Sequence, residues 1–260
     1  MKTTVLNSYN DEAIVFLNPM GSDTRFWKKN FPDEILENYE VIFIDYPGYN
    51  SKFFKYKNFA EQAVDLCDNV LCKIKKPLHL IGYSYGGFLA QYIVNQNLEN
   101  IKSMILIGSS YKLNPINIEI NSVLKSVAKE NLLLFCRSLS IISHEADEIN
   151  SNPLMGLQKF ANLKLSIDNS DVICNQLEHL LKHKSITFTC DKSLNTLIIY
   201  GENDKMMSDA DINYYRNYFE NLKVFKLRNE SHMIPTETLY PLIINHFNTI
   251  EHDRLSFANV

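Results

Sequence analysis

The sequence lacks the features that direct a protein into a membrane or onto nucleic acid. No apolar run in its 260 residues approaches the length of about 20 residues that crosses a bilayer. Residues 1–7 carry no apolar core of a signal peptide. The net charge is −4 and no long basic run is present, so nucleic acid is not an expected partner. We therefore expect a cytoplasmic protein with neither a membrane nor a nucleic-acid partner.

Paired cysteines and recognisable cofactor motifs are also missing. The five cysteines are an odd number, are scattered, and show no metal-ligand spacing, so we expect reduced thiols and no metal site. They are Cys67, Cys72, Cys136, Cys174 and Cys190. No glycine-rich phosphate-binding loop occurs either. The sequence therefore implies no cofactor.

What the sequence does contain is an alternation of short apolar runs with helical patterns, without internal repeats or Gly/Ser linkers. Runs that are apolar on both faces, separated by amphipathic helices, predict a parallel sheet covered by helices on both sides. Strands are predicted at 5–8, 13–17, 41–44, 78–81, 104–108, 197–200 and 224–227. Helices are predicted at 59–73, 88–94, 210–218 and 240–252, with weaker helical patterning at 27–37 that Pro32 interrupts.

The alternation stops between about residues 112 and 189. This segment has helical stretches, such as 123–138 and 172–182, but no convincing strand. A helical block inserted between two strands of one sheet is typical of a lid. We therefore expect a core domain of residues 1–111 and 190–260 with a helical cap at 112–189.

The central motif is Gly82-Tyr83-Ser84-Tyr85-Gly86, which fits the pattern G-x-S-x-G and is followed by Gly87. It lies between a predicted buried strand and a predicted helix. In that context the pattern indicates a sharp turn in which a strained serine is exposed, and small residues two places away let strand and helix approach closely. Ser84 is therefore the candidate nucleophile, at the positive end of a helix.

A serine hydroxyl needs a base, and the base needs an orienting acid. In a sheet of this kind both are expected after the serine, in loops at the carboxyl ends of later strands. Asp204 follows the strand at 197–200, and His232 follows the strand at 224–227. We predict His232 as general base and Asp204 as the acid, with Glu202 and, less plausibly, Asp209 as rival acids.

Taken together, the chain resembles proteins of the α/β-hydrolase fold with a small helical cap, over essentially its whole length. The resemblance is carried by segments 17–23 with Trp27, 45–49, 82–87, 200–204 and 231–232. It implies a mostly parallel eight-stranded sheet. It also carries the family's catalytic serine, acid and histidine over onto Ser84, Asp204 and His232.

The resemblance further implies an oxyanion hole built from two backbone N–H groups. One is the amide of Tyr85, and the other comes from the loop after an early strand, by position the amide of Met20. The sequence departs from the family there, with Asn18-Pro19 where His-Gly is common, and Pro19 has no N–H to donate. Asn-Pro-Met-Gly is similar to the Asn-Ser-Leu-Gly of enol-lactonases. The alternative interpretation is that residues 18–21 form only a tight turn.

The expected chemistry is hydrolysis of an ester or thioester with a small-to-medium, largely apolar acyl group, because the cap is rich in apolar residues and Met207 and Met233 lie beside mechanistic positions. An enol-lactonase or carbon–carbon bond hydrolase, a ligand sensor, and an incidental haloperoxidase-like activity stay open. Cap lysines either meet an acyl carrier protein or a coenzyme A tail, or form a solvated face. These lysines are Lys125, Lys129, Lys159, Lys164 and Lys182. The sequence sets no oligomeric state.

Overall fold

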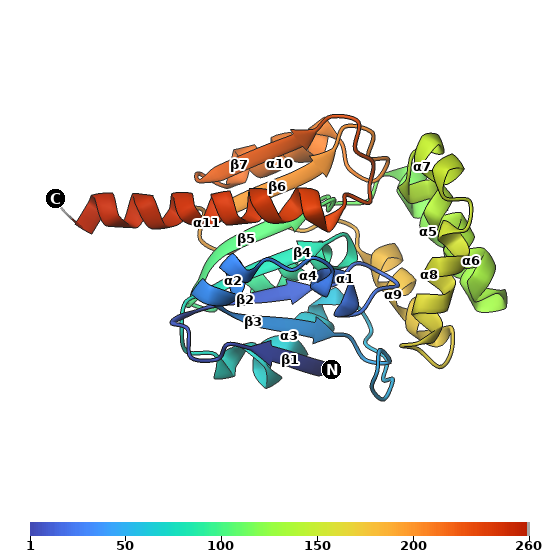
Figure 1. Cartoon of the computed structure of the whole chain (residues 1–260), viewed down its shortest axis with the longest axis horizontal. Coiled ribbons are helices and arrows are strands. Elements are labelled where there is room, and N and C mark those ends of the chain that lie inside the picture. Colours follow the sequence, from blue (N-terminus) through green and yellow to red (C-terminus); the bar gives the residue numbers. More distant parts are fainter. Residues whose placement is uncertain (259–260) are drawn as a thin grey trace.

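The computed structural model describes residues 1–258, with side chains to residue 250, and its centre is one twisted sheet (Figure 1). In this part of the chain the sheet has seven strands, in the order β1-β3-β2-β4-β5-β6-β7. Only β1 pairs antiparallel, with β3. The strands are β1 (Lys2–Leu6), β2 (Glu12–Leu17), β3 (Tyr39–Asp45), β4 (Leu78–Tyr83), β5 (Ile101–Ile107), β6 (Asn195–Gly201) and β7 (Leu222–Leu227).

The mostly parallel α/β-hydrolase sheet is thus as predicted, but the expectation of eight strands was wrong for the described residues. In the described residues, the part before β2 forms a single edge strand, β1, which pairs with β3. That strand covers residues 2–6 rather than the predicted 5–8. The other six predicted strands are confirmed, each within a few residues of its expected limits.

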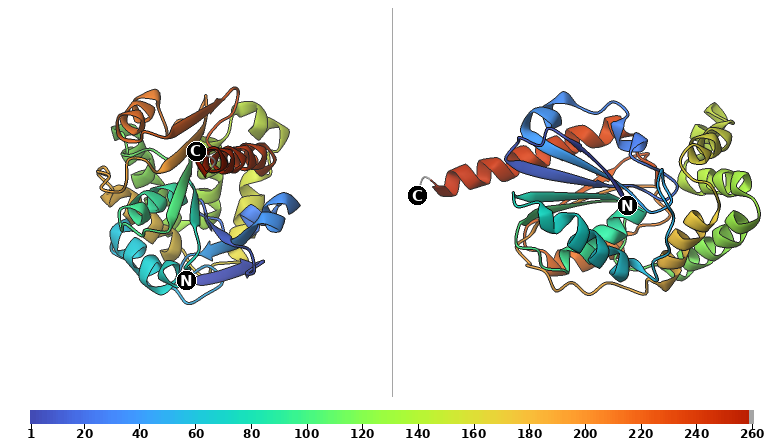
Figure 2. Two further views of the ribbon diagram at one scale, coloured as in Figure 1. Left: turned by 90° about the vertical axis from the view of Figure 1, so that its left-hand side faces the viewer. Right: turned by 90° about the horizontal axis from the view of Figure 1, so that it is seen from below.

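Helices cover both faces of the sheet, as Figure 2 shows from two further directions. Side chains alternate along each strand: Ile14 and Phe16 of β2 face one hydrophobic cluster, and Val15 and Leu17 face the other. The first face is covered by α1 (Arg25–Lys28), α2 (Asp33–Asn38) and α11 (Thr236–Ala258). The second is covered by α3 (Phe59–Asn69), α4 (Tyr85–Val94) and α10 (Asp209–Tyr218). A 3-10 turn (Leu71–Lys73) follows α3.

Five helices between β5 and β6 stand over the carboxyl ends of the strands (Figure 1). They are α5 (Pro115–Glu130), α6 (Leu132–Ser143), α7 (Ala146–Ser151), α8 (Met155–Lys164) and α9 (Asp171–Lys182). Residues 112–189 contain no strand, as predicted. The predicted helix at 123–138 is instead divided at Asn131, whose side chain accepts a hydrogen bond from the Leu134 amide and so starts α6.

Helix α9 is joined to the core by buried polar contacts. The Tyr85 hydroxyl lies 2.7 Å from Nδ1 of His179, and the Tyr49 hydroxyl donates to Oε1 of Gln176 at 2.8 Å. Since Tyr85 is the first residue of α4, these contacts fix α9 directly beside the turn that carries Ser84. The outer helices α6, α7 and α8 pack mainly on each other and on α5.

Candidate active site

The turn between β4 and α4 presents Ser84 in a strained conformation. The strand ends at Tyr83, the helix begins at Tyr85, and Ser84 between them has φ 50° and ψ −113°. A Cβ on Gly82 would lie 2.4 Å from the Gly86 carbonyl oxygen, and one on Gly86 would lie 2.3 Å from the Leu17 carbonyl oxygen. The glycines are therefore required by the close approach of strand, helix and the end of β2, as the motif predicts.

The structure brings Ser84, His232 and Asp204 together, although 148 residues separate the serine from the histidine. Oγ of Ser84 lies 3.0 Å from Nε2 of His232, and Nδ1 of His232 lies 3.0 Å from both carboxylate oxygens of Asp204. His232 and Asp204 are buried. This geometry allows the Asp204 carboxylate to accept from Nδ1–H, which leaves Nε2 to accept the serine proton.

The rival acids lie elsewhere. Glu202 is exposed to solvent. Asp209 accepts a hydrogen bond from the Tyr200 hydroxyl at 2.8 Å and pairs with Lys226, and these contacts, with Tyr200 the largest, lower the pKa of its carboxyl. Of the three acids, only Asp204 contacts the imidazole.

Tyr83 is a residue of this site that the sequence did not predict. Its hydroxyl donates to the backbone carbonyl of His232 at 2.8 Å and accepts from the amide of Ile234. Burial raises the pKa of Tyr83 well above 10, so the phenol keeps the proton that it donates. Tyr83 thereby ties the histidine loop to the strand that ends at Ser84. The only signal in the sequence was an aromatic residue inside the G-x-S-x-G motif.

The loop after β2 approaches the same edge and is fixed by side chains. Asn18 donates to the carbonyl of Ile44 at 2.8 Å, and Asp45 accepts from both the amide and the hydroxyl of Thr24 at 2.7 Å. The Ser22 amide donates to the Pro19 carbonyl at 3.3 Å, so a turn is present here.

The two predicted oxyanion donors stand at this edge. In the described part of the chain neither the Met20 amide nor the Tyr85 amide donates to another residue. Tyr85 is the first residue of α4, where backbone N–H groups have no partner within the helix.

A small cavity of about 40 Å³ surrounds Ser84, with polar groups from Asn121, Ser143, Lys159 and His232. Its apolar wall is formed by Pro19, Met20, Phe88, Leu113, Leu139, Leu180, Met206 and Met233. Met20 and Met233 are where the sequence predicts them. Met207 is not in the wall: it packs in the hydrophobic core, and Met206 lines the cavity in its place. The Met206 amide donates to Asp204 at 2.7 Å, which turns the loop so that residue 206 faces the site.

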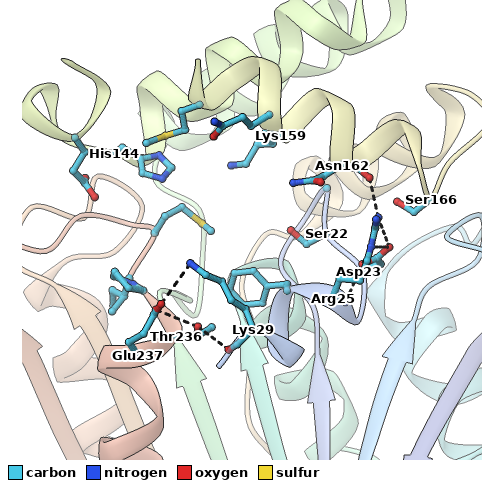
Figure 3. Close-up of a pocket in the computed structure, with 18 residues that line it drawn as sticks. Ser22, Asp23, Arg25, Lys29, His144, Lys159, Asn162, Ser166, Thr236 and Glu237 are labelled. Atoms are coloured by element: carbon cyan, nitrogen blue, oxygen red, sulfur yellow. Dashed lines mark hydrogen bonds and ion pairs between the residues drawn. The ribbon is translucent and has the colours of Figure 1, made fainter. Parts of the chain in front are cut away.

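A larger cavity of about 500 Å³ lies between the inserted helices and the end of the sheet domain (Figure 3). Its walls come from the α1 region, from α7 and α8 of the cap, and from the start of α11. Lys159 and Met233 line both cavities, so they mark the boundary between them.

Three further histidines, His79, His179 and His183, make structural contacts. His79 lies between Oγ of Ser103, 2.7 Å away, and Oε2 of Glu12, 2.9 Å away, so it is hydrogen-bonded inside the fold. Burial lowers the pKa of His179 and of His183. The side chain of His252 lies outside the described residues.

The described residues show no disulfide and no cluster of His, Cys, Asp or Glu that could hold a metal ion. Within the same part of the chain, no helix has both the length and the apolar character to cross a bilayer.

Comparison with known proteins agrees with this architecture. A model of the alpha/beta hydrolase family matches residues 14–150, and the chain belongs to that family. The structure of MGS-M2, an alpha/beta hydrolase enzyme from a Medee basin deep-sea metagenome library, is similar with a TM-score of 0.79. The two are 19% identical, and the match covers 95% of this chain and 94% of the other.

Two curated relatives match a shorter part of the chain. The biotin biosynthesis bifunctional protein BioHC of Teredinibacter turnerae is 29% identical over 111 residues, which is 39% of this chain and 18% of that protein. The pimeloyl-[acyl-carrier protein] methyl ester esterase of Wigglesworthia glossinidia brevipalpis is 31% identical over 98 residues. That match covers 37% of this chain and 36% of the esterase, so the chain spans about a third or less of either relative.

Proposed function

We propose that the protein is a serine hydrolase that cleaves an ester or thioester through an acyl-enzyme. The observation that carries the proposal is the continuous hydrogen-bonding line from Ser84 through His232 to Asp204, with 3.0 Å at each step. A strained serine at a helix N-terminus, open to a cavity, adds to it.

In the proposed mechanism, Oγ of Ser84 attacks the substrate carbonyl while Nε2 of His232 takes its proton. The negative charge that develops on the carbonyl oxygen is met by the amides of Met20 and Tyr85, which have no acceptor among the residues that the structure describes. His232 then protonates the leaving alcohol or thiol. Water, deprotonated by His232, attacks the acyl-enzyme and releases the acid, and Asp204 stabilises the imidazolium in both steps.

The proposed substrate has a small-to-medium, largely apolar acyl group. Methionine, leucine and phenylalanine side chains form most of the wall around Ser84, and they adapt well to a flexible chain. The similarity to an esterase that acts on a methyl ester of an acyl-carrier-protein conjugate favours an ester and leaves a carrier-linked acyl group among the candidates. We further propose that residues 112–189 act as the cap over this site.

The test is hydrolysis of p-nitrophenyl esters of increasing chain length by the wild type and by Ser84→Ala. Ser84→Ala is expected to lose at least about 10³-fold in kcat/KM, because the nucleophile is gone. Ser126→Ala removes an exposed cap hydroxyl and serves as the matched control with wild-type activity. Equal activity of Ser84→Ala and wild type would exclude the mechanism.

The alternatives have their own signatures in the same experiment. A sensor would show one burst of p-nitrophenol, equal to the protein concentration, followed by very slow release of the acyl group. An enol-lactonase or carbon–carbon bond hydrolase would turn over simple esters poorly at every chain length while keeping a Ser84-dependent reaction with its own carbonyl substrate. Acyl-coenzyme A substrates distinguish thioester from ester preference.

A further inference from the structure

Lys159 of α8 occupies the junction of the two cavities. Its side chain is half-buried and extends from the helix toward the middle of the larger cavity (Figure 3). It also lines the small cavity that holds Ser84. The sequence left this residue among lysines that either meet an acyl carrier protein or a coenzyme A tail or form a solvated face. The structure instead places it on the inner side of the cap.

The position of Lys159 means that a substrate has to pass it. The cavity at Ser84 measures about 40 Å³, less than a tenth of the volume of about 500 Å³ of the larger cavity. Lys159 and Met233 lie where this smaller space meets the larger one. A larger substrate whose carbonyl lies at Ser84 must therefore extend past Lys159 and Met233 into the cavity of about 500 Å³.

Lys159 differs from the other cations of the larger cavity in its partners. Arg25 pairs with Asp23 at 2.8 Å, and Lys29 lies 3.4 Å from Glu237. Lys159 has no carboxylate within ion-pair distance and no hydrogen-bond acceptor among the described residues.

The remaining carboxylate in the wall of the larger cavity, Glu148, is not a partner of Lys159 either. Glu148 accepts from the Glu145 amide at 2.8 Å and lies 3.3 Å from the Ser231 hydroxyl. Of the three lining cations, Lys159 is thus the one without an anion.

An unpaired ammonium in a partly closed site is costly unless a ligand supplies the counter-charge. Burial lowers the pKa of Lys159 to about 8, which still leaves most of the population charged at pH 7. The titratable groups that interact electrostatically with Lys159 are Cys136, whose pKa burial raises to about 11, and His144, whose pKa burial and Lys159 both lower. Both neighbours are therefore neutral at pH 7, and neither supplies an anion.

We propose that Lys159 is a specificity-determining residue that binds a carboxylate carried by the substrate, next to the scissile carbonyl. This inference rests on the proposed function, since it names the substrate class of the same site: an ester or thioester with one anionic group and an otherwise apolar body. A single ammonium matches the single charge of a carboxylate. A phosphate usually takes several donors, such as a bidentate arginine or a row of backbone amides, and Lys159 stands among apolar side chains.

The kinetic test compares two esters of equal length, mono-p-nitrophenyl glutarate and p-nitrophenyl pentanoate, which differ in a terminal carboxylate against a methyl group. The readout is the ratio of kcat/KM for the anionic ester to that for the neutral ester. Lys159→Met, which keeps the length of the side chain, is expected to lower this ratio about ten- to a hundredfold, mainly through KM. Lys159→Arg is expected to restore most of it.

Lys164→Met is the matched control, because Lys164 lies on the same helix and is exposed. It is expected to leave the ratio at the wild-type value. A ratio that Lys159→Met does not change, or that Lys164→Met lowers equally, would overturn the proposal while leaving the hydrolase mechanism intact.

A binding experiment separates this proposal from the proposed function. Glutarate is titrated calorimetrically into Ser84→Ala, with and without Lys159→Met, and inorganic phosphate is the second arm. Glutarate binding that depends on Lys159 supports the proposal even if the wild type hydrolyses neither ester. Binding of phosphate alone, or glutarate binding that survives Lys159→Met, would overturn the carboxylate assignment.

Discussion

The sheet carries two clusters of a serine, a histidine and a carboxylate, one near each end of its strands. At the carboxyl ends, Ser84 and Asp204 bind opposite nitrogens of His232. Toward the amino ends, Ser103 of β5 and Glu12 of β2 bind opposite nitrogens of His79, at 2.7 and 2.9 Å. By distances alone the two clusters are nearly equivalent.

Their surroundings separate them. Ser103 is fully buried and His79 is 1% exposed, so a substrate carbonyl has no access to the hydroxyl. Ser103 lies inside a strand, whereas Ser84 stands at a strained turn before a helix and opens to a cavity. A hydrogen-bonded serine, histidine and carboxylate can therefore serve only to join neighbouring strands. The Ser84 cluster differs in three ways: a cavity gives access to the serine, the backbone is strained at the serine, and backbone amides beside it are free to donate.

Exchanging the two carboxylates for amides gives the largest expected contrast. Asp204→Asn is expected to lower kcat about 10⁴-fold, because an amide at this position favours the wrong tautomer of His232. Glu12→Gln is expected to leave kcat within about twofold and to act only on stability. Steady-state kinetics with a p-nitrophenyl ester measures both.

Glu202→Gln is the control for the Asp204 loop, because Glu202 is exposed and does not contact His232. It is expected to keep wild-type kcat. A large loss in Glu202→Gln with little loss in Asp204→Asn would reassign the acid. A large loss in Glu12→Gln would mean that the two clusters are coupled.

Removing the Tyr83 hydroxyl should give a smaller effect on the catalytic cluster. Tyr83→Phe leaves the buried Ile234 amide without its acceptor and frees the His232 carbonyl, at a cost of about 1–3 kcal/mol. We expect kcat to fall about ten- to a hundredfold with little change in KM, because the imidazole rather than the cavity is displaced. Tyr218→Phe, which loses a contact to the Cys190 carbonyl far from the site, is the control. A change in KM alone would argue against a positioning role.

The smallest expected effect on activity is at His246, near the His79 cluster, where the change is in stability. His246 is buried, neither ring nitrogen has a partner within the described residues, and burial lowers its pKa to about 4. The unfolded chain binds this proton near pH 6.5, so the free energy of unfolding should fall as pH drops from about 6.5 to 4, by about 2–3 kcal/mol for this group. His183, with its pKa lowered to about 4, adds a similar loss.

Denaturant titrations between pH 4 and 8 test this expectation. His246→Leu should flatten the decline by about half, whereas the exposed-loop variant Ser8→Ala should keep the wild-type slope. An unchanged slope in His246→Leu would show that the lost stability arises from other groups. Activity at pH 7 should be unaffected, since His246 lies in α11 away from the Ser84 cavity.

Some residues of the candidate site are predictable from the sequence, and others are not. The positions of Ser84, Asp204 and His232 are predictable because each lies in the connection that follows a strand, and parallel strands end at one edge. The sequence does not predict that Met206 rather than Met207 lines the cavity, because this depends on a turn held by the Asp204 carboxylate. The sequence also does not predict that Lys159 faces the cavities. Helix α8 has only a weak apolar stripe, and its orientation is set by packing on α6.

The two ends of the segment that carries the inserted helices are held together. The Ile186 amide donates to the Tyr111 carbonyl at 2.9 Å, and the rings of Tyr111 and Tyr214 stack 3.8 Å apart, so the segment leaves and re-enters the sheet at one clamped point. Because both ends of the insertion meet at this point, residues 112–185 leave and return beside the same ends of β5 and β6, and the length of chain between them does not set the distance between these two strands.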